Sequence, residues 1–244
     1  VDCIFLDPAR RNEHGGKTVA ISDCEPNVAE LEGLLLSKAN RIMIKLSPML
    51  DLSQALKELP HTQEVHIISV NNECKELLLL LGQTAPEEIP VHCVNLSTKG
   101  EQEKQLFVFT REQEQHSECS YTDTLGNYLY EPNASLLKAG AFRSIAAAYS
   151  VKKLHPNSHL YTSDTQIEGF PGRTFRIINR CSLNKKEIKE NLSDLKKANI
   201  TVRNFPATVA ELRKRIKLAE GGDTYLFAST LNDGQKILIR CGKV

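Results

Sequence analysis

The chain has 244 residues, enough for one large domain or for two or three small ones. Charged residues make up 25% and apolar residues 41%, a composition that is ordinary for a folded soluble protein and excludes a disordered one. Apolar runs such as Leu77 to Leu81 are far too short to cross a bilayer, so we expect a cytoplasmic protein with no membrane partner.

Charge is distributed unevenly along the chain, although the net charge is only +1. Residues 172–244 contain 16 lysines and arginines against 7 acidic residues, which gives this segment a net charge of +9. The preceding residues carry a net charge of −8. A basic segment joined to an acidic one favours an anionic partner, although lysines on solvent-facing helices would produce the same asymmetry.

The seven cysteines and seven histidines show no spacing typical of a metal site. The sequence contains no Cys-x-x-Cys pair and no His-Glu-x-x-His motif. We therefore expect reduced cysteines, no disulfide framework and no bound metal.

Strand-like and helix-like segments alternate over residues 1–112, which predicts a first domain with a mostly parallel sheet covered by helices. Charged residues between the last two strands indicate a terminal antiparallel hairpin. The predicted strands are Val1–Leu6, Arg41–Leu46 and Glu64–Val70, the predicted helices are Glu25–Lys38, Asp51–Leu59 and Cys74–Leu81, and the hairpin joins Val91–Leu96 to Gln105–Thr110.

The polar segment from Arg111 to Thr124 lacks periodicity and is predicted to be a linker. Residues 125–170 then read as a strand–helix–strand unit, with strands at Tyr128–Glu131 and Ser158–Thr162. Asn133 is a favourable N-cap for the helix, which we expect to continue to about Tyr149.

Two acidic residues, Glu131 and Asp164, stand at the ends of the strands of this unit. We expect them to form structural ion pairs with Arg143 or Lys138 rather than to act in catalysis.

The final segment, residues 171–244, follows the order β-α-β-α-β-β. Asn184 and the capping box at Thr208 to Glu211 mark two helix starts, and Gly221 is placed to end the second helix. Asn232 to Gly234 is a strong hairpin signal. The predicted strands are Thr174–Arg180, Ile200–Phe205, Tyr225–Ser229 and Lys236–Cys241.

Asp7 and Pro8, at the end of the first strand, form the motif with the most chemical content. An acidic residue at the carboxyl end of a parallel strand faces the crevice where open α/β sheets bind ligands. Such a carboxylate can orient or deprotonate an amino group, and nearby arginines can hold a phosphate. Asp-Pro also commonly follows the end of a strand without any functional role. A ligand-binding role and a purely structural role therefore both stay open at this point.

Lys45 and Ser47 end the second strand and should lie at the same sheet edge as Asp7. Asn71 and Asn72 end the third strand, where we expect a turn or capping role.

The strand ending in Asp-Pro-Ala-Arg resembles the fourth motif of class I S-adenosylmethionine-dependent methyltransferases, in which a strand ends in Asp-Pro-Pro-Tyr or a relative of it. The whole chain is similar to a bacterial methyltransferase family with a C-terminal THUMP-like domain. The segments that carry the resemblance are FLDPARR (Phe5–Arg11), KLSPMLD (Lys45–Asp51), YLYEPNASLLKAGAF (Tyr128–Phe142), HPNSHLYTSD (His155–Asp164) and FPGRTFRI (Phe170–Ile177).

The resemblance implies an α/β chain: the C-terminal half of a Rossmann-like methyltransferase sheet, a small ferredoxin-like β-α-β unit and a THUMP-like domain. It implies catalytic roles for Asp7, Pro8 and Arg10, and substrate binding by Arg11, Lys45 and Ser47. Because THUMP domains are associated with RNA modification enzymes, RNA is the implied partner. The implied RNA-binding residues are Arg173, Arg176, Arg180, Lys185, Lys186, Arg213, Lys214 and Arg215.

The chain departs from the family pattern in its cofactor-binding part. No Gly-x-Gly-x-Gly turn occurs, and the first strand corresponds to the fourth strand of that fold. We therefore expect a piece without the N-terminal cofactor-binding half, which would bind S-adenosylmethionine weakly or not at all. Ala9 replaces the second proline and Arg10 the aromatic residue, so methylation of an amino group is not implied.

No cysteine is placed beside Asp7 to act as a covalent nucleophile, which argues against chemistry at the C5 atom of a pyrimidine. We expect direct methyl transfer, driven mostly by proximity and orientation. The alternative is a non-catalytic RNA-binding adaptor.

Overall fold

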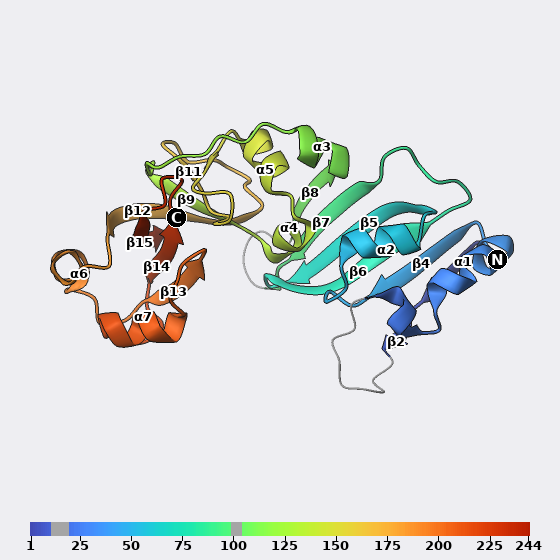
Figure 1. Ribbon diagram of the computed structural model, residues 1–244, viewed down its shortest axis with the longest axis horizontal. Coiled ribbons are helices and arrows are strands. Elements are labelled where there is room, and N and C mark those ends of the chain that lie inside the picture. Colours follow the sequence, from blue (N-terminus) through green and yellow to red (C-terminus); the bar gives the residue numbers. More distant parts are fainter. Residues whose placement is uncertain (11–19, 99–103) are drawn as a thin grey trace. The chain divides into compact units, whose positions relative to one another are not determined.

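The computed structural model describes residues 1–10, 20–98 and 104–244, which form two compact units (Figure 1). The first unit comprises Val1–His116 and Asn133–Ala141. The second unit comprises Ser117–Pro132 and Phe142–Val244. The chain thus enters the second unit, returns to the first for one short segment, and then completes the second.

A six-stranded sheet in the order β1-β4-β6-β5-β7-β8 forms the centre of the first unit. A separate short ladder pairs β2 (Ala9–Arg10) with β3 (Cys24–Glu25). The six strands are β1 (Cys3–Leu6), β4 (Arg41–Leu46), β5 (Thr62–Val70), β6 (Glu73–Leu81), β7 (Pro90–Leu96) and β8 (Lys104–Thr110).

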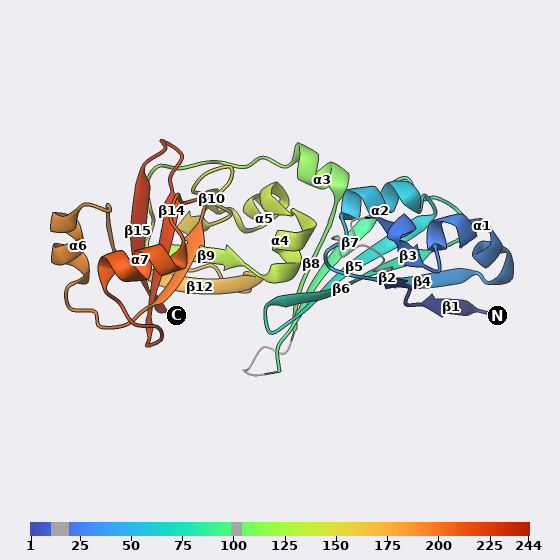
Figure 2. The same cartoon turned by 60° about the horizontal axis from the view of Figure 1, so that its bottom comes forward.

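Short helices lie on one face of this sheet, as Figure 2 shows for the first two α-helices. Polar side chains begin them: Asn27 accepts a hydrogen bond from Ala29 N, and Asp51 accepts one from Gln54 N. Alternate strand residues point towards the helices and are fully buried, among them Ile44, Val65 and Leu79. The helices are η1 (Ile21–Asp23), α1 (Val28–Lys38), α2 (Leu52–Glu58), α3 (Arg111–His116) and α4 (Ala134–Ala139).

The helix predicted at Cys74–Leu81 is wrong, because this segment is strand β6 at the centre of the sheet. Asn71 and Asn72 both have positive φ angles, 50° and 64°, and form the tight turn that joins β5 to β6. The leucine run then alternates between the two faces of the sheet: Leu77, Leu79 and Leu81 are buried and the residues between them are half-buried.

The expectation of a mostly parallel sheet is also wrong. Among the described strands of this six-stranded sheet, only the pairs β1–β4 and β5–β7 are parallel. The three remaining ladders, β4–β6, β5–β6 and β7–β8, are antiparallel. The terminal hairpin of β7 and β8 is confirmed.

Two further boundaries differ from the expectations. The predicted linker begins with helix α3, which continues directly from β8. The single helix expected from Asn133 to about Tyr149 is divided into α4 and α5 (Phe142–Tyr149), because Gly140 has a φ of 74° and ends α4. Asn133 caps α4 as expected.

The second unit contains a seven-stranded sheet in the order β10-β11-β9-β12-β15-β14-β13. Helix α5 belongs to this unit, as do α6 (Lys185–Leu192) and α7 (Val209–Ile216). The strands are β9 (Tyr128–Pro132), β10 (Lys152–Lys153), β11 (Tyr161–Ser163), β12 (Gly172–Cys181), β13 (Asn199–Arg203), β14 (Thr224–Thr230) and β15 (Lys236–Lys243).

Two apolar clusters cover opposite faces of the sheet of the second unit. Phe175 and Phe227 belong to one cluster, while Leu226 and Ala228 belong to the other, so adjacent residues of β14 alternate between them. Leu192 of α6 and Leu212 of α7 lie in the second cluster.

The order β-α-β-α-β-β predicted for the last segment is confirmed by β12, α6, β13, α7, β14 and β15. The Thr208 capping box is present, but α7 ends at Lys217, whose φ is 61°, rather than at Gly221. Taken together, the chain has the predicted mixed α/β fold class. In the part of the chain that the structure describes, every helix falls short of the length and apolar character that a membrane span requires.

Candidate functional site

A pocket of about 300 Å³ lies at the carboxyl ends of β1 and β4. These strands are parallel neighbours, so the residues that follow them emerge at the same edge of the sheet. Asp7 and Pro8 follow β1, while Lys45 and Ser47 lie at the end of β4, and all four line the pocket. The structure thus brings together four of the site residues predicted from the sequence.

An ion pair joins the two strand ends inside this pocket. Lys45 Nζ donates a hydrogen bond to Asp7 Oδ2 at 2.6 Å. This hydrogen bond to the carboxylate raises the pKa of Lys45 above its ordinary value, so the ammonium group stays protonated. The Asp7 side chain is 54% exposed, so this carboxylate remains accessible to a ligand.

Apolar side chains and a second lysine complete the pocket wall. Cys24 and Leu50 are buried and form part of it, in contrast to the expectation that no cysteine is placed beside Asp7. Lys75 of β6 adds another cation. Lys75 also pairs with Glu73 at 2.6 Å. Sequence reasoning missed Lys75 because the segment was assigned to a helix; a central strand beside β4 would have placed it here.

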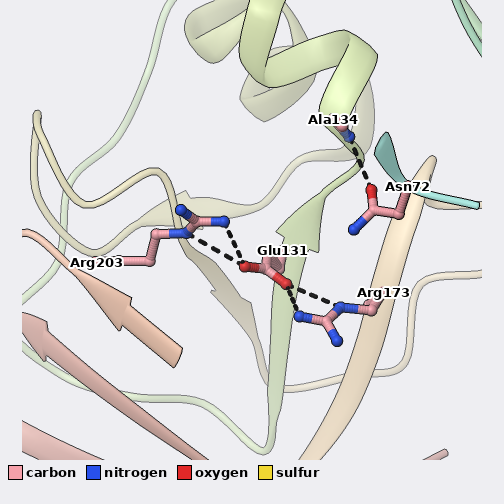
Figure 3. A network of polar contacts seen from close by, with 5 residues as sticks. All are labelled: Asn72, Glu131, Ala134, Arg173 and Arg203. Atoms are coloured by element: carbon pink, nitrogen blue, oxygen red, sulfur yellow. Dashed lines mark hydrogen bonds and ion pairs between the residues drawn. The ribbon is translucent and has the colours of Figure 1, made fainter. Parts of the chain in front are cut away.

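The remaining predicted residues of the first unit are placed less completely. Arg10 lies in β2, where its backbone pairs with Cys24, and Arg11 lies outside the described residues. Asn71 and Asn72 act in the turn between β5 and β6, with Asn72 Oδ1 accepting a hydrogen bond from Ala134 N at 2.8 Å (Figure 3).

A buried carboxylate ties three strands of the second unit together. Glu131 of β9 is 2% exposed and lies between two arginines, Arg173 of β12 and Arg203 of β13 (Figure 3). Arg173 donates from Nε and Nη2 to Oε2, with the Nε bond at 2.9 Å. Arg203 donates from Nε and Nη2 to Oε1, at 3.2 and 2.9 Å. The expected partners of Glu131, Arg143 and Lys138, are therefore wrong.

Lys138 instead belongs to the first unit, where its Nζ donates to the carbonyl oxygen of Leu50 at 2.7 Å. The sequence did not reveal this because Ala134–Ala139 packs with β5, β6 and β7, far away along the chain. The ion pair between Glu131 and Arg203 was not predicted for the same reason, since the two residues are 72 positions apart in the sequence.

The predicted RNA-binding residues fall into two groups. Four are bound to other groups of the protein: Arg173 to Glu131, Lys186 to Glu190 at 4.0 Å, Arg213 to the carbonyl oxygen of Ala198 and Arg215 to that of Leu183. The other four are exposed and form no ion pair with the described residues: Arg176, Arg180, Lys185 and Lys214.

Comparison with protein families divides the second half of the chain. Residues 128–171 match the model of a ferredoxin-like domain, and residues 172–243 match that of a THUMP domain-like family. The chain therefore carries a ferredoxin-like domain followed by a THUMP-like domain.

One solved structure is similar to the chain over its full length. It is a crystal structure from Porphyromonas gingivalis W83 described as a "putative methyltransferase", with 40% sequence identity and a TM-score of 0.89. The chain spans 60% of the length of that protein. None of the curated proteins compared with the chain matches it significantly.

Proposed function

We propose that this chain is the C-terminal portion of an S-adenosylmethionine-dependent methyltransferase that acts on RNA. The observation that carries the proposal is the convergence of Asp7, Pro8, Lys45 and Ser47 in one pocket at the ends of two parallel strands. The similarity to the P. gingivalis protein supports the reaction type, and the THUMP-like domain supports RNA as the substrate class.

In this proposal the pocket holds and orients the group that receives the methyl. The Asp7 carboxylate accepts a hydrogen bond from an N–H or O–H of the target nucleotide, which fixes the direction of its lone pair. Lys45 restricts the rotamers of Asp7 through the 2.6 Å hydrogen bond. The cation of Lys75 favours a nearby phosphate.

We propose that the described residues do not build the whole cofactor site. The pocket beside Asp7 is about 300 Å³ and is lined by side chains of β1, β4 and β6 and their connections, with no glycine-rich turn among them. The outer edge of β1 is unpaired among the described strands, and Phe5 on it is 57% exposed. We propose that a further part of the protein continues the sheet at this edge and supplies the cofactor site.

A binding measurement tests whether the cofactor site lies outside this chain. Isothermal titration of the 244-residue chain with S-adenosylmethionine should show weak binding or none. Micromolar affinity for this chain by itself would contradict the proposal that the cofactor site lies elsewhere.

The substrate class is tested by methyl transfer. The protein that joins this chain to its cofactor-binding part should transfer the labelled methyl of S-adenosylmethionine to total cellular RNA. Ribonuclease treatment should release the label from the acid-insoluble material. Label that stays acid-insoluble would place the acceptor in protein and contradict an RNA substrate.

A non-catalytic RNA-binding adaptor is the second candidate. The observation in its favour is that Lys45 already occupies one carboxylate oxygen of Asp7. The two candidates differ in one result: an adaptor binds RNA with strong salt dependence but transfers no methyl group in any context.

A further inference from the structure

Three potential metal ligands lie together on β5 and β7 of the first unit, away from the Asp7 pocket. Glu64 and His66 are two residues apart on β5, so their side chains lie on the same face of the sheet. His92 on β7 is the direct register partner of His66 on the neighbouring parallel strand. This arrangement, rather than any spacing in the sequence, brings the three side chains together.

The side chains are close enough to bind one ion. His66 Nε2 lies 3.2 Å from Glu64 Oε2, and His92 Nε2 lies 3.9 Å from the same oxygen. The potential ligand atoms of all three residues lie within 4.8 Å of one another, and no other such group of three occurs among residues 1–10, 20–98 and 104–244. Two ligands with bonds of about 2.0–2.1 Å can be at most about 4.2 Å apart, so small side-chain rotations suffice.

The surroundings restrict these side chains without closing the site. The imidazole rings of His66 and His92 stack with centroids 4.3 Å apart and an interplanar angle of 7°. Their register neighbours are apolar, Leu78 on β6 and Val108 on β8. The three side chains are between 25% and 45% exposed, so an ion can enter from solvent.

The ligand set indicates the class of ion. Imidazole nitrogens with one carboxylate suit Zn²⁺, Ni²⁺ and Cu²⁺, whereas Mg²⁺ and Ca²⁺ prefer an all-oxygen set. Three protein ligands leave at least one position for water. We propose that Glu64, His66 and His92 bind a single divalent transition-metal ion of the zinc class. This proposal differs from the expectation of a metal-free protein and is independent of the proposed function.

The test uses the tag-free, metal-free chain titrated with Zn²⁺ and with Co²⁺. One equivalent of Zn²⁺ should bind, and H66Q or H92Q should weaken binding at least tenfold, since each removes a ligand. H116Q is the matched control, because His116 is exposed on α3 and should not alter the affinity. Thermal unfolding of the metal-free variants establishes that each one folds.

Co²⁺ identifies the ligand atoms. Cobalt bound by imidazole and carboxylate should show weak visible absorption without the strong ultraviolet band of a cobalt–thiolate bond. A thiolate band would assign the ion to a cysteine, such as the exposed Cys3, and would overturn the proposal. No zinc binding, or binding that H92Q and E64Q leave unchanged, would also overturn it and leave the trio as a hydrogen-bonded surface cluster.

Discussion

The two units each contain a carboxylate bound to basic side chains, and the two arrangements differ in a revealing way. Glu131 in the second unit is 2% exposed and uses both oxygens to bind two arginines. Asp7 in the first unit is 54% exposed, has one lysine partner and lines a pocket. A buried carboxylate with saturated acceptors holds strands together, whereas an accessible one at a strand end is available to a ligand.

The pKa shifts of two basic side chains, one in each unit, have opposite directions. The pKa of Lys45 is raised by its hydrogen bond to Asp7, so this pocket retains a positive charge. In the second unit, burial lowers the pKa of His159 to about 4, and the charges of Lys153 and Arg203 add to this effect. The second unit therefore disfavours a further cation at His159, whereas the pocket of the first unit stabilises the one that it holds.

The largest expected effect on stability comes from Glu131→Gln. The variant keeps the shape of the side chain but leaves Arg173 and Arg203 without their anion. Because both arginines are partly exposed and water can solvate them, we expect a loss of about 2–3 kcal/mol in the free energy of unfolding. Urea denaturation followed by circular dichroism measures it. Asp7→Asn is the matched control and should leave the unfolding midpoint nearly unchanged, because Asp7 is exposed. Equal losses in both variants would remove the distinction between the two carboxylates.

A smaller effect is expected from pH through His159. The unfolded state binds a proton near pH 6.5 and the folded state only near pH 4, so the contribution of neutral His159 is complete above pH 6.5 and is lost as the pH falls towards 4. Because the ring is only half-buried and water screens its charge, we expect this residue to account for about 2 kcal/mol of that loss. His159→Asn tolerates the φ of 51° at this position and removes the titrating ring.

The comparison of urea midpoints at pH 7 and pH 4.5 isolates His159, because carboxylates such as Glu211 titrate alike in the native protein and in the variant. A variant whose stability falls as steeply as that of the native protein would contradict a neutral His159.

The smallest expected effect concerns the salt dependence of RNA binding. Arg176 and Arg180 are exposed and form no ion pair with the described part of the chain, so the double alanine variant should reduce the slope of log K against log salt by about 0.7 for each phosphate that is no longer neutralised. Arg173→Ala should change this slope less, because Arg173 is engaged by Glu131. Filter binding at several salt concentrations measures both slopes, and equal changes would place Arg173 directly on the RNA.

The local parts of the fold could be predicted from the sequence because they depend on neighbouring residues. The strand Arg41–Leu46 and the capping box at Thr208 are found where their patterns place them. The proximity of Asp7 and Lys45 could also be predicted, because each residue stands at the carboxyl end of a predicted strand. The structure shows that these two strands are parallel neighbours.

Contacts between residues far apart in sequence could not be predicted. The leucine run of β6 fits a buried helix as well as a central strand, and only the Asn71-Asn72 turn before it indicates a hairpin. Glu131 pairs with Arg203, and His66 stacks on His92, because of strand order that no local pattern contains.

The central claim is that the Asp7 pocket receives the methyl acceptor. The direct measurement is methyl transfer from S-adenosylmethionine to RNA by the complete protein carrying Asp7→Asn, compared with Glu30→Gln, an exposed residue of α1 outside the pocket. We predict that Asp7→Asn lowers the rate on the order of 100-fold with RNA affinity unchanged, while Glu30→Gln has no effect. An Asp7→Asn protein that transfers methyl groups at the native rate would contradict this assignment of the pocket.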